Sequence, residues 1–239
     1  MLNSYYSFAE DVINGYSGSA HLKDIQSGKY VISNISNLDI FGFSAQDQII
    51  GYSIWDLNSF MSPYWGNNFA NEINDIDIKT SFTNINHNIK KWFLSPDKKL
   101  RLHEIQKIPI KNSKGKITSI LTLSNNNISN CNYFELYRNY KFFYKNKNTA
   151  IKEFLSHIEA IDYFYCLPTE SELEILILKY KYNFPVKEIS SILKKSVKSI
   201  EQHIYNLRSI KLLNFDLYNV LNKFDTSRHI YNYISHEYK

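Results

Sequence analysis

The amino-acid sequence predicts an α+β fold, in which an N-terminal region with an antiparallel β-sheet and helices precedes a region built only of helices. Two patterns support this prediction. Between residues 30 and 124, short runs with strand character are separated by turn sequences. From residue 131 onward, apolar side chains recur at spacings of three and four residues, which is the period of an amphipathic helix. A chain of 239 residues, 44% of them hydrophobic, is long enough to bury the cores of two domains.

The N-terminal region, residues 1–130, is expected to start with a helical lead-in over residues 1–18. A strand at 30–33 comes next, followed by short helical turns punctuated by glycines. A longer helix with apolar residues at helical spacing is predicted after residue 68. Antiparallel strands then complete the region, at residues 89–94, 99–110 and 116–124.

Residues 131–166 are expected to form a connector of two helices, and Asn148 and Thr149 are expected to cap the second one. Aromatic side chains share one face of the first helix, at Phe134, Tyr137, Tyr140 and Tyr144. Helices this short must bury such a face. We therefore expect this face, together with a last helix at residues 217–224, to form a dimer contact, with burial inside one chain as the alternative.

Residues 167–239 are expected to form an all-α unit of four helices. The first starts at Thr169, because Glu172 follows at the spacing of a capping box. The second and third are joined by a tight turn, and Ser196 stands at the N-cap position of the third. The apolar side of the third helix consists of Val197, Ile200, Ile204 and Leu207. This arrangement is the outline of a helix-turn-helix DNA reader.

Positive charge is concentrated on this helix pair. The net charge of the chain is +5, yet residues 1–130 contain 12 basic and 11 acidic side chains. Residues 187–211 contain six basic and two acidic side chains. A locally basic surface is what a contact with the phosphate backbone of DNA requires.

A series of motifs between residues 167 and 213 resembles the LuxR-type helix-turn-helix family. They follow the order of the family pattern: Thr169, Glu172-Leu173-Glu174, Lys187-Glu188-Ile189-Ser190, Ser196, Ser199-Ile200, His203 and Asn206. The chain departs from the pattern at Ser171, where the family has Arg, and at Glu201, where it has Lys. The resemblance implies an all-α DNA-binding unit.

Residues 21–129 are similar to a PAS sensor domain. The segment SAQDQIIGYSIWDL resembles the helical part of that family, and KGKITSILTLSNNNIS resembles its closing strand. The family often ends in Asp-Ile-Thr, where this chain has Asn127-Ile128-Ser129. The resemblance implies a domain with a PAS-like antiparallel sheet and helices. It also implies that this domain senses a signal.

The outer face of the third helix is expected to enter the major groove. Gln202 can read adenine, and Lys198 can reach guanine or a phosphate. Basic and hydroxyl side chains at the edges are expected to contact phosphate. The predicted DNA-binding set is Lys187, Lys195, Ser196, Lys198, Ser199, Glu201, Gln202, Tyr205, Asn206 and Arg208.

Five aromatic side chains of the N-terminal region are candidates for lining a ligand pocket, with a plain core as the alternative: Trp55, Phe60, Tyr64, Trp65 and Trp92. The cofactor is unknown. None is required, and we expect a small apolar or aromatic ligand, or none, rather than haem. The histidines that haem would need, His21, His87 and His103, are isolated, and such histidines are usually ordinary core or surface residues.

The sequence contains no nucleophile elbow, phosphate-binding Gly loop or metal-spaced His pair, so neither an enzyme nor a metal site is expected. No run approaches the ~18 apolar residues of a membrane helix. With no signal-peptide pattern and two isolated cysteines, a cytoplasmic protein is expected.

The sequence therefore predicts a homodimeric transcription regulator that binds double-stranded DNA and senses a signal through its N-terminal region. RNA polymerase is a further candidate partner. The alternative is a protein-interaction or ligand-binding module whose helix-turn-helix contacts a protein.

Overall fold

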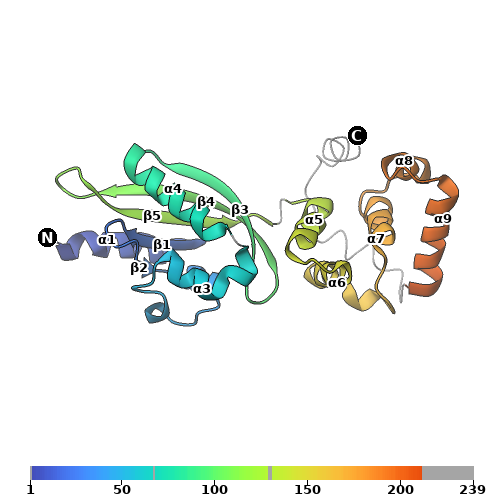
Figure 1. Cartoon of the computed structure of the whole chain (residues 1–239), viewed down its shortest axis with the longest axis horizontal. Helices are drawn as coiled ribbons and strands as arrows, with labels where there is room; N and C mark the ends of the chain where they lie inside the picture. Colours follow the sequence, from blue (N-terminus) through green and yellow to red (C-terminus); the bar gives the residue numbers. More distant parts are fainter. Residues whose placement is uncertain (1, 67, 129–130, 212–239) are drawn as a thin grey trace. The chain divides into compact units, whose positions relative to one another are not determined.

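The computed structural model describes residues 2–66, 68–128 and 131–211 (Figure 1). The chain divides into two compact units, Met1–Ile128 and Ser129–Lys239. The first unit contains one antiparallel sheet with helices, and the described part of the second contains only helices. The predicted α+β fold class is therefore confirmed.

The sheet of the first unit has five strands, all paired antiparallel. They are β1 (Ser19–Asp24), β2 (Tyr30–Ser33), β3 (His87–Leu94), β4 (Leu100–Lys111) and β5 (Ile117–Asn126). Their order is β2-β1-β5-β4-β3, so β1 pairs with β5, which is far from it in sequence. The three long strands β3, β4 and β5 are those that the sequence predicted, with ends shifted by one or two residues.

Strand β1 was not predicted. Its sequence, SAHLKD, has no clear alternation of apolar and polar residues, and yet five of its six residues are buried. Polar residues are buried there because β2 and β5 flank the strand on both sides and helices cover both of its faces. Such a strand cannot be recognised from hydrophobic periodicity.

Alternation of side chains along β1 and β5 gives the sheet two different faces. On one face, Leu22 and Leu121 lie opposite each other and pack with Ile13 of α1 (Leu2–Gly15). On the other face, His21 and Thr122 lie opposite each other. This second face is covered by α2 (Ile35–Phe41), α3 (Ile54–Trp65) and α4 (Phe69–Thr83) (Figure 1).

Polar caps fix where these helices begin. Asn34 caps α2 by accepting a hydrogen bond from the Asn37 backbone N–H at 3.0 Å, and the Asn34 amide nitrogen donates to the Gly18 carbonyl at 2.8 Å. Ser53 caps α3, and the Asp56 carboxylate accepts from the Ser53 backbone N–H at 2.7 Å. A 3-10 turn at Gln46–Gln48 lies between the two helices.

The described part of the second unit begins with the two helices that the sequence assigned to a connector. They are α5 (Tyr133–Phe143) and α6 (Lys147–His157). The N-cap of α6 is Asn146, two residues before the predicted Asn148, because the Asn146 side chain accepts from the Thr149 backbone N–H at 3.1 Å. Both helices belong to the second compact unit. The three-part division into 1–130, 131–166 and 167–239 stays a prediction.

The aromatic face of α5 is buried within this unit. Phe134, Tyr137 and Tyr140 are all less than one-tenth exposed, and the two tyrosines pack against Phe154 of α6. Burial inside one chain, the alternative noted from the sequence, therefore describes this face, and it is not available for a dimer contact. The predicted helix at 217–224 lies outside the described residues.

A 3-10 turn at Ile161–Tyr163 follows α6, and three further α-helices come after it: α7 (Glu170–Leu176), α8 (Val186–Ile192) and α9 (Val197–Asn206). The capping box of α7 forms as predicted, with the Glu172 carboxylate accepting from the Thr169 backbone N–H at 2.7 Å. Helices α7 and α9 each continue as a π-helical turn, at Ile177–Lys181 and Leu207–Lys211. Among the described residues, no helix is long and apolar enough to cross a membrane.

Candidate functional sites

Helices α8 and α9 form the predicted helix-turn-helix. The turn between them is held by a reciprocal pair of hydrogen bonds, in which the Lys195 backbone N–H donates to the Ser190 carbonyl at 3.1 Å and the Ser190 hydroxyl donates to the Lys195 carbonyl at 2.6 Å. Lys194 adopts a positive φ of 52° in this turn. Ser196 caps α9 by accepting from the Ser199 backbone N–H at 3.1 Å.

The buried side of α9 is set by Ile200, Ile204 and Leu207, all less than one-tenth exposed. They anchor α9 against α7 and α8. The prediction that Val197 belongs to this side was wrong, because Val197 is 39% exposed. It is the first residue of the helix, where only the turn precedes it, so no neighbouring element covers it.

The opposite side of α9 is exposed. Most of the predicted DNA-binding residues lie there or at the adjacent start of α8, and Tyr205 is 63% exposed. The exposed members are Lys187, Ser196, Lys198, Glu201, Gln202, Tyr205 and Arg208. The half-buried members are Lys195, Ser199 and Asn206.

Several of these side chains already have a partner. The Gln202 amide nitrogen donates to Asn206 Oδ1 at 3.0 Å, and Arg208 Nε donates to the Tyr180 hydroxyl at 2.8 Å. Lys195 Nζ donates to Ser171 Oγ, the position where the LuxR-type pattern has an Arg. The partner atom in each of these contacts is neutral, so the contacts position the side chains and leave the charges of Lys195 and Arg208 uncompensated.

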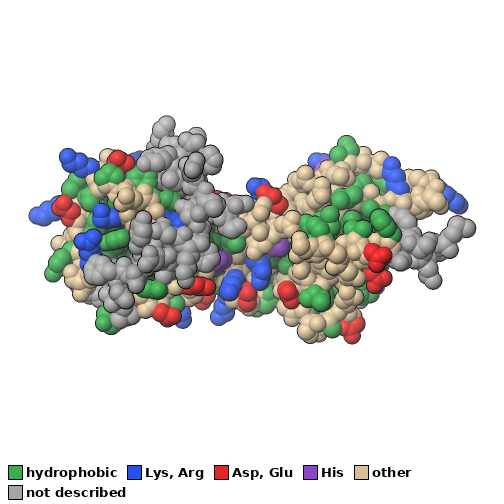
Figure 2. Space-filling view, turned by 180° about the vertical axis from the view of Figure 1, so that it is seen from behind, with side chains coloured by type: hydrophobic (Ala, Val, Ile, Leu, Met, Phe, Trp, Pro, Cys, Tyr) green, Lys and Arg blue, Asp and Glu red, His purple; other side chains and the backbone are tan. Residues whose placement is uncertain are grey.

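The basic side chains of this surface are not neutralised. Among the described residues, no carboxylate lies within ion-pair distance of Lys187, Lys194, Lys195, Lys198 or Arg208. Figure 2 shows Lys and Arg side chains along the edge of the second unit that α9 forms. We therefore treat the outer face of α9 and the start of α8 as the candidate nucleic-acid interface.

The first unit contains a second candidate site, a cavity of about 50 Å³ between the sheet and the helices α2, α3 and α4. We call it the inner cavity. Its helix side is largely apolar and includes Ile40, Phe41 and Ile73. Its sheet side is largely polar: Ser19, His21, His103, Lys107, Thr122 and Ser124.

A buried ion triad borders this cavity. Lys107 Nζ lies 2.7 Å from Asp77 Oδ1, and Lys23 Nζ lies 2.8 Å from Asp77 Oδ2. The side chains of Lys107 and Lys23 are 1% and 4% exposed, and that of Asp77 is 14% exposed. Burial alone would raise the pKa of Asp77, but the two ammonium groups outweigh it and hold this pKa well below 3.8. Burial lowers the pKa of Lys107 to about 8 against the opposing effect of Asp77.

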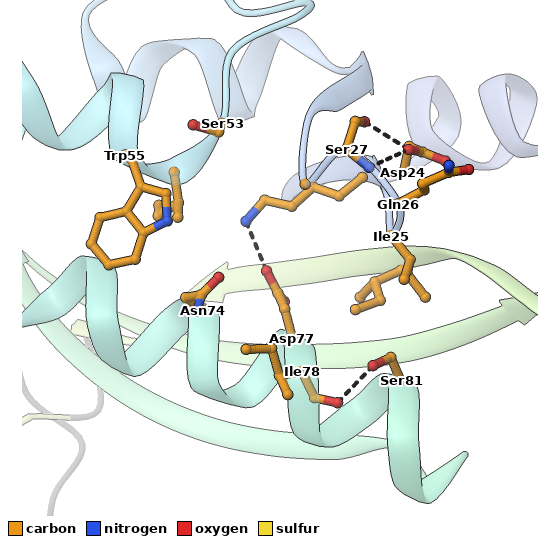
Figure 3. Close-up of a pocket in the computed structure, with 14 residues that line it drawn as sticks. Asp24, Ile25, Gln26, Ser27, Ser53, Trp55, Asn74, Asp77, Ile78 and Ser81 are labelled. Atoms are coloured by element: carbon orange, nitrogen blue, oxygen red, sulfur yellow. Dashed lines mark hydrogen bonds and ion pairs between the residues drawn. The ribbon is translucent and has the colours of Figure 1, made fainter.

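The triad also borders an outer pocket of about 240 Å³, which Lys23 and Asp77 line. Figure 3 shows Asp77 extending from α4 between Trp55 on one side and, on the other, Asp24 at the end of β1 and Ser27 of the β1–β2 turn. Trp55 is 47% exposed. The ion triad thus lies between a pocket at the surface and the inner cavity.

The five predicted pocket aromatics do not form one site. Trp65 lines the inner cavity and stacks on Phe69 with ring centroids 4.6 Å apart, whereas Trp55 lines the outer pocket. Phe60, Tyr64 and Trp92 line neither of these two. The sequence pointed to aromatic residues, while the structure brings polar side chains of β1, β4 and β5 to the inner cavity.

The three histidines weighed as haem ligands also separate. His21 and His103 line the inner cavity, but His87 does not, and its ring lies 3.1 Å from the Thr83 hydroxyl. A cavity of about 50 Å³ is far smaller than a porphyrin. Among the described residues, no group of three or more His, Cys, Asp or Glu side chains is arranged to hold a metal ion.

Comparison with known proteins finds solved structures that align with this chain at low sequence identity. No family model matches the chain, and no curated protein matches it. A Vibrio cholerae VqmA–ligand–DNA complex aligns at 18% identity and a TM-score of 0.49, over 94% of this chain and 88% of that one. A Vibrio cholerae VqmA dimer, described as a LuxR-type receptor, aligns at 20% identity and 0.42, over 87% and 80%. The PAS domain of Bordetella pertussis BvgS aligns at 20% and 0.45, over 52% and 87%.

The fold that the resemblance implied is present in the chain's own structure. The first unit has a PAS-like five-stranded antiparallel sheet with α2, α3 and α4 on one face and α1 on the other, and the second contains the LuxR-type order of α7, α8 and α9.

Proposed function

We propose that this protein is a sequence-specific DNA-binding transcription regulator, that α9 is its recognition helix, and that a signal sensed by the first unit controls it. The observation that carries the proposal is the division of α9 into two sides. Ile200, Ile204 and Leu207 fix one side in the unit, so Lys198, Gln202 and Tyr205 must face outward. A helix anchored in this way can enter the major groove, which is wide enough for it.

Charge and capping support the same assignment. The exposed lysines of the interface have no carboxylate partner among the described residues, so their charge is available to phosphates. The N-terminus of α9 adds its own positive end to this surface. Glu201 is the exception, and we propose that it accepts from a cytosine amine in the groove.

We further propose that the regulator acts as a homodimer. Two copies of α9 related by a two-fold axis would reach half-sites about 34 Å apart, one helical turn of DNA. Sedimentation of the full chain with and without operator DNA measures this directly. A monomer that binds DNA with one protein per operator would contradict it.

The DNA-binding assignment is tested with two kinds of variant after genomic binding sites have been mapped. Gln202→Ala should weaken binding to the mapped operator by about 1–3 kcal/mol and change binding to random DNA little, because a base contact is lost. Lys187→Ala should weaken both alike and lower the slope of log K against log salt by about 0.9, because one phosphate contact is lost. Lys187 suits this test because it is exposed and no hydrogen bond of its side chain is found among the described residues.

Lys152→Ala is the matched control, because Lys152 is an exposed lysine of the same unit on α6. It should change neither quantity. If all three variants bind the operator as the wild type does while remaining folded, α9 is not the reader. If the wild type shows no salt-dependent DNA binding at all, a protein partner for the helix-turn-helix becomes the better account.

A further inference from the structure

Three polar side chains form a row across the inner face of the sheet. His21 on β1 lies directly opposite Thr122 on β5, and Thr122 lies directly opposite Lys107 on β4. Side chains at such paired positions are close neighbours on one face. All three residues line the inner cavity, and each is more than nine-tenths buried. We call these residues the polar row.

Two atoms of the polar row, His21 Nε2 and Thr122 Oγ1, have no hydrogen-bond partner among the described residues. Buried polar atoms in folded proteins nearly always have one. Because these atoms belong to residues that line a cavity, a small polar molecule in that cavity can supply the missing partner.

The hydrogen bond at the other ring nitrogen determines what His21 offers. Nδ1 lies 3.1 Å from Asn37 Oδ1, and the Asn37 amide nitrogen donates to Ser33 Oγ at 2.8 Å. An amide oxygen only accepts, so Nδ1 carries the proton and Nε2 of the neutral ring has a free lone pair. Burial, followed by the ammonium groups of Lys107 and Lys23, lowers the pKa of His21 well below 6.5, so the ring is neutral at pH 7.

The charge at this end of the cavity is unbalanced. The two ammonium groups of the ion triad share one carboxylate, and Lys107 also lines the cavity. One positive charge is therefore left over in a buried place, which favours an anion. Two other titratable groups line the cavity and remain neutral at pH 7. Burial raises the pKa of Tyr30 above 10 and lowers that of His103 to about 4.

We propose that the inner cavity binds a small monocarboxylate, that its oxygens accept hydrogen bonds from Lys107 Nζ and Thr122 Oγ1, and that His21 takes up one proton when the ligand binds. A carboxylate only accepts, so it would face the lone pair of a neutral Nε2. A proton taken from solvent converts His21 to an imidazolium that donates to the ligand instead. The complex thus holds one carboxylate and one added proton.

The other wall and the size of the cavity limit the ligand. Ile40, Phe41 and Ile73 offer apolar contacts to a short alkyl group. A volume of about 50 Å³ corresponds to only a few water-sized spaces, so the ligand has few non-hydrogen atoms. Acetate and propionate fit this description. A ligand of four non-hydrogen atoms cannot bind more tightly than a Kd of about 40 µM.

The test is calorimetric titration of the full chain, purified without carboxylate buffers, with acetate. This inference rests on the proposed sensory role of the first unit, but the titration contains no DNA, so its failure and a failure of DNA binding are distinguishable. Acetate should bind in the range from tens of micromolar to millimolar. The Kd should be about tenfold higher at pH 7 than at pH 6, because one proton is taken up on binding. Acetamide, which has the same shape and no charge, should bind at least tenfold more weakly.

Variants assign the site. Thr122→Val keeps the shape of the side chain and should weaken acetate binding about tenfold, since one charge-assisted hydrogen bond is lost. Lys107→Met should abolish measurable binding. Thr118→Val, at a position of β5 that does not line the inner cavity, is the control and should bind as the wild type does. The proposal is overturned if acetate does not saturate the protein at millimolar concentration, if acetamide binds as tightly, if the Kd is unchanged between the two pH values, or if Thr122→Val binds as Thr118→Val does.

Discussion

Replacing Asp77 by Asn removes the only carboxylate of the buried ion triad and keeps the shape of the side chain. The ammonium groups of Lys23 and Lys107, 4% and 1% exposed, would then lie side by side without a counter-charge. Removing one partner of a buried ion pair typically costs about 3–5 kcal/mol, because the remaining charge is left uncompensated. We expect Asp77→Asn to lower the free energy of unfolding of the first unit by about this amount at pH 7.

The pH dependence of this loss has a defined sign. The pKa of Asp77 in the folded protein is well below 3.8, so its stabilising effect is complete above pH 3.8 and is lost progressively as the pH falls from 3.8 to the lower pKa of the folded protein. The difference between wild type and variant should therefore shrink below pH 3.8. It should also shrink above pH 8, where Lys107, with a pKa of about 8, loses its proton and no longer attracts Asp77.

Urea unfolding followed by tryptophan fluorescence is the assay, because Trp55, Trp65 and Trp92 are the three tryptophans of the chain and all lie in the first unit. Asp75→Asn, at an exposed position of the same helix, is the control and should change stability by less than about 0.5 kcal/mol. Equal stability of the Asp77→Asn and Asp75→Asn proteins at pH 7 would refute the reasoning.

Two further predictions concern a close contact at a glycine and a helix cap. Gly18→Ala should destabilise the first unit by about 1–3 kcal/mol, because a Cβ there would lie 2.3 Å from Asn125 Oδ1 and 2.5 Å from the Ser124 carbonyl oxygen. Gly15→Ala, whose Cβ would meet nothing within 4 Å, should leave the urea midpoint unchanged or raise it. Thr169→Ala should destabilise the second unit by about 1 kcal/mol, because the α7 cap is lost. Circular dichroism at the helix minimum measures it, and a loss no larger than that of Thr149→Ala, which caps no helix, would count against the capping role.

Local signals in the sequence determined most of the helical elements and the long strands. Ser196 and Thr169 predicted the starts of α9 and α7, because a capping side chain needs only the next three residues of its own chain. The outward stripe of Lys198, Gln202 and Tyr205 followed in the same way, since the apolar period fixes which side of a helix is buried. Val197 shows the limit of this rule, because at a helix end the period does not say whether a neighbour is present.

The inner cavity was decided only by the tertiary structure. His21, Thr122 and Lys107 lie up to about 100 positions apart in the chain, and they meet because β1 pairs with β5 and β5 with β4. Strand register is a long-range property, so no local pattern brings these three polar residues together. Burial of Lys107 likewise depends on Asp77, which α4 places 2.7 Å from the Lys107 ammonium. The sequence by itself determined the helices and the outward face of the proposed reader, whereas the charge and hydrogen-bonding character of the cavity exist only once the sheet has formed.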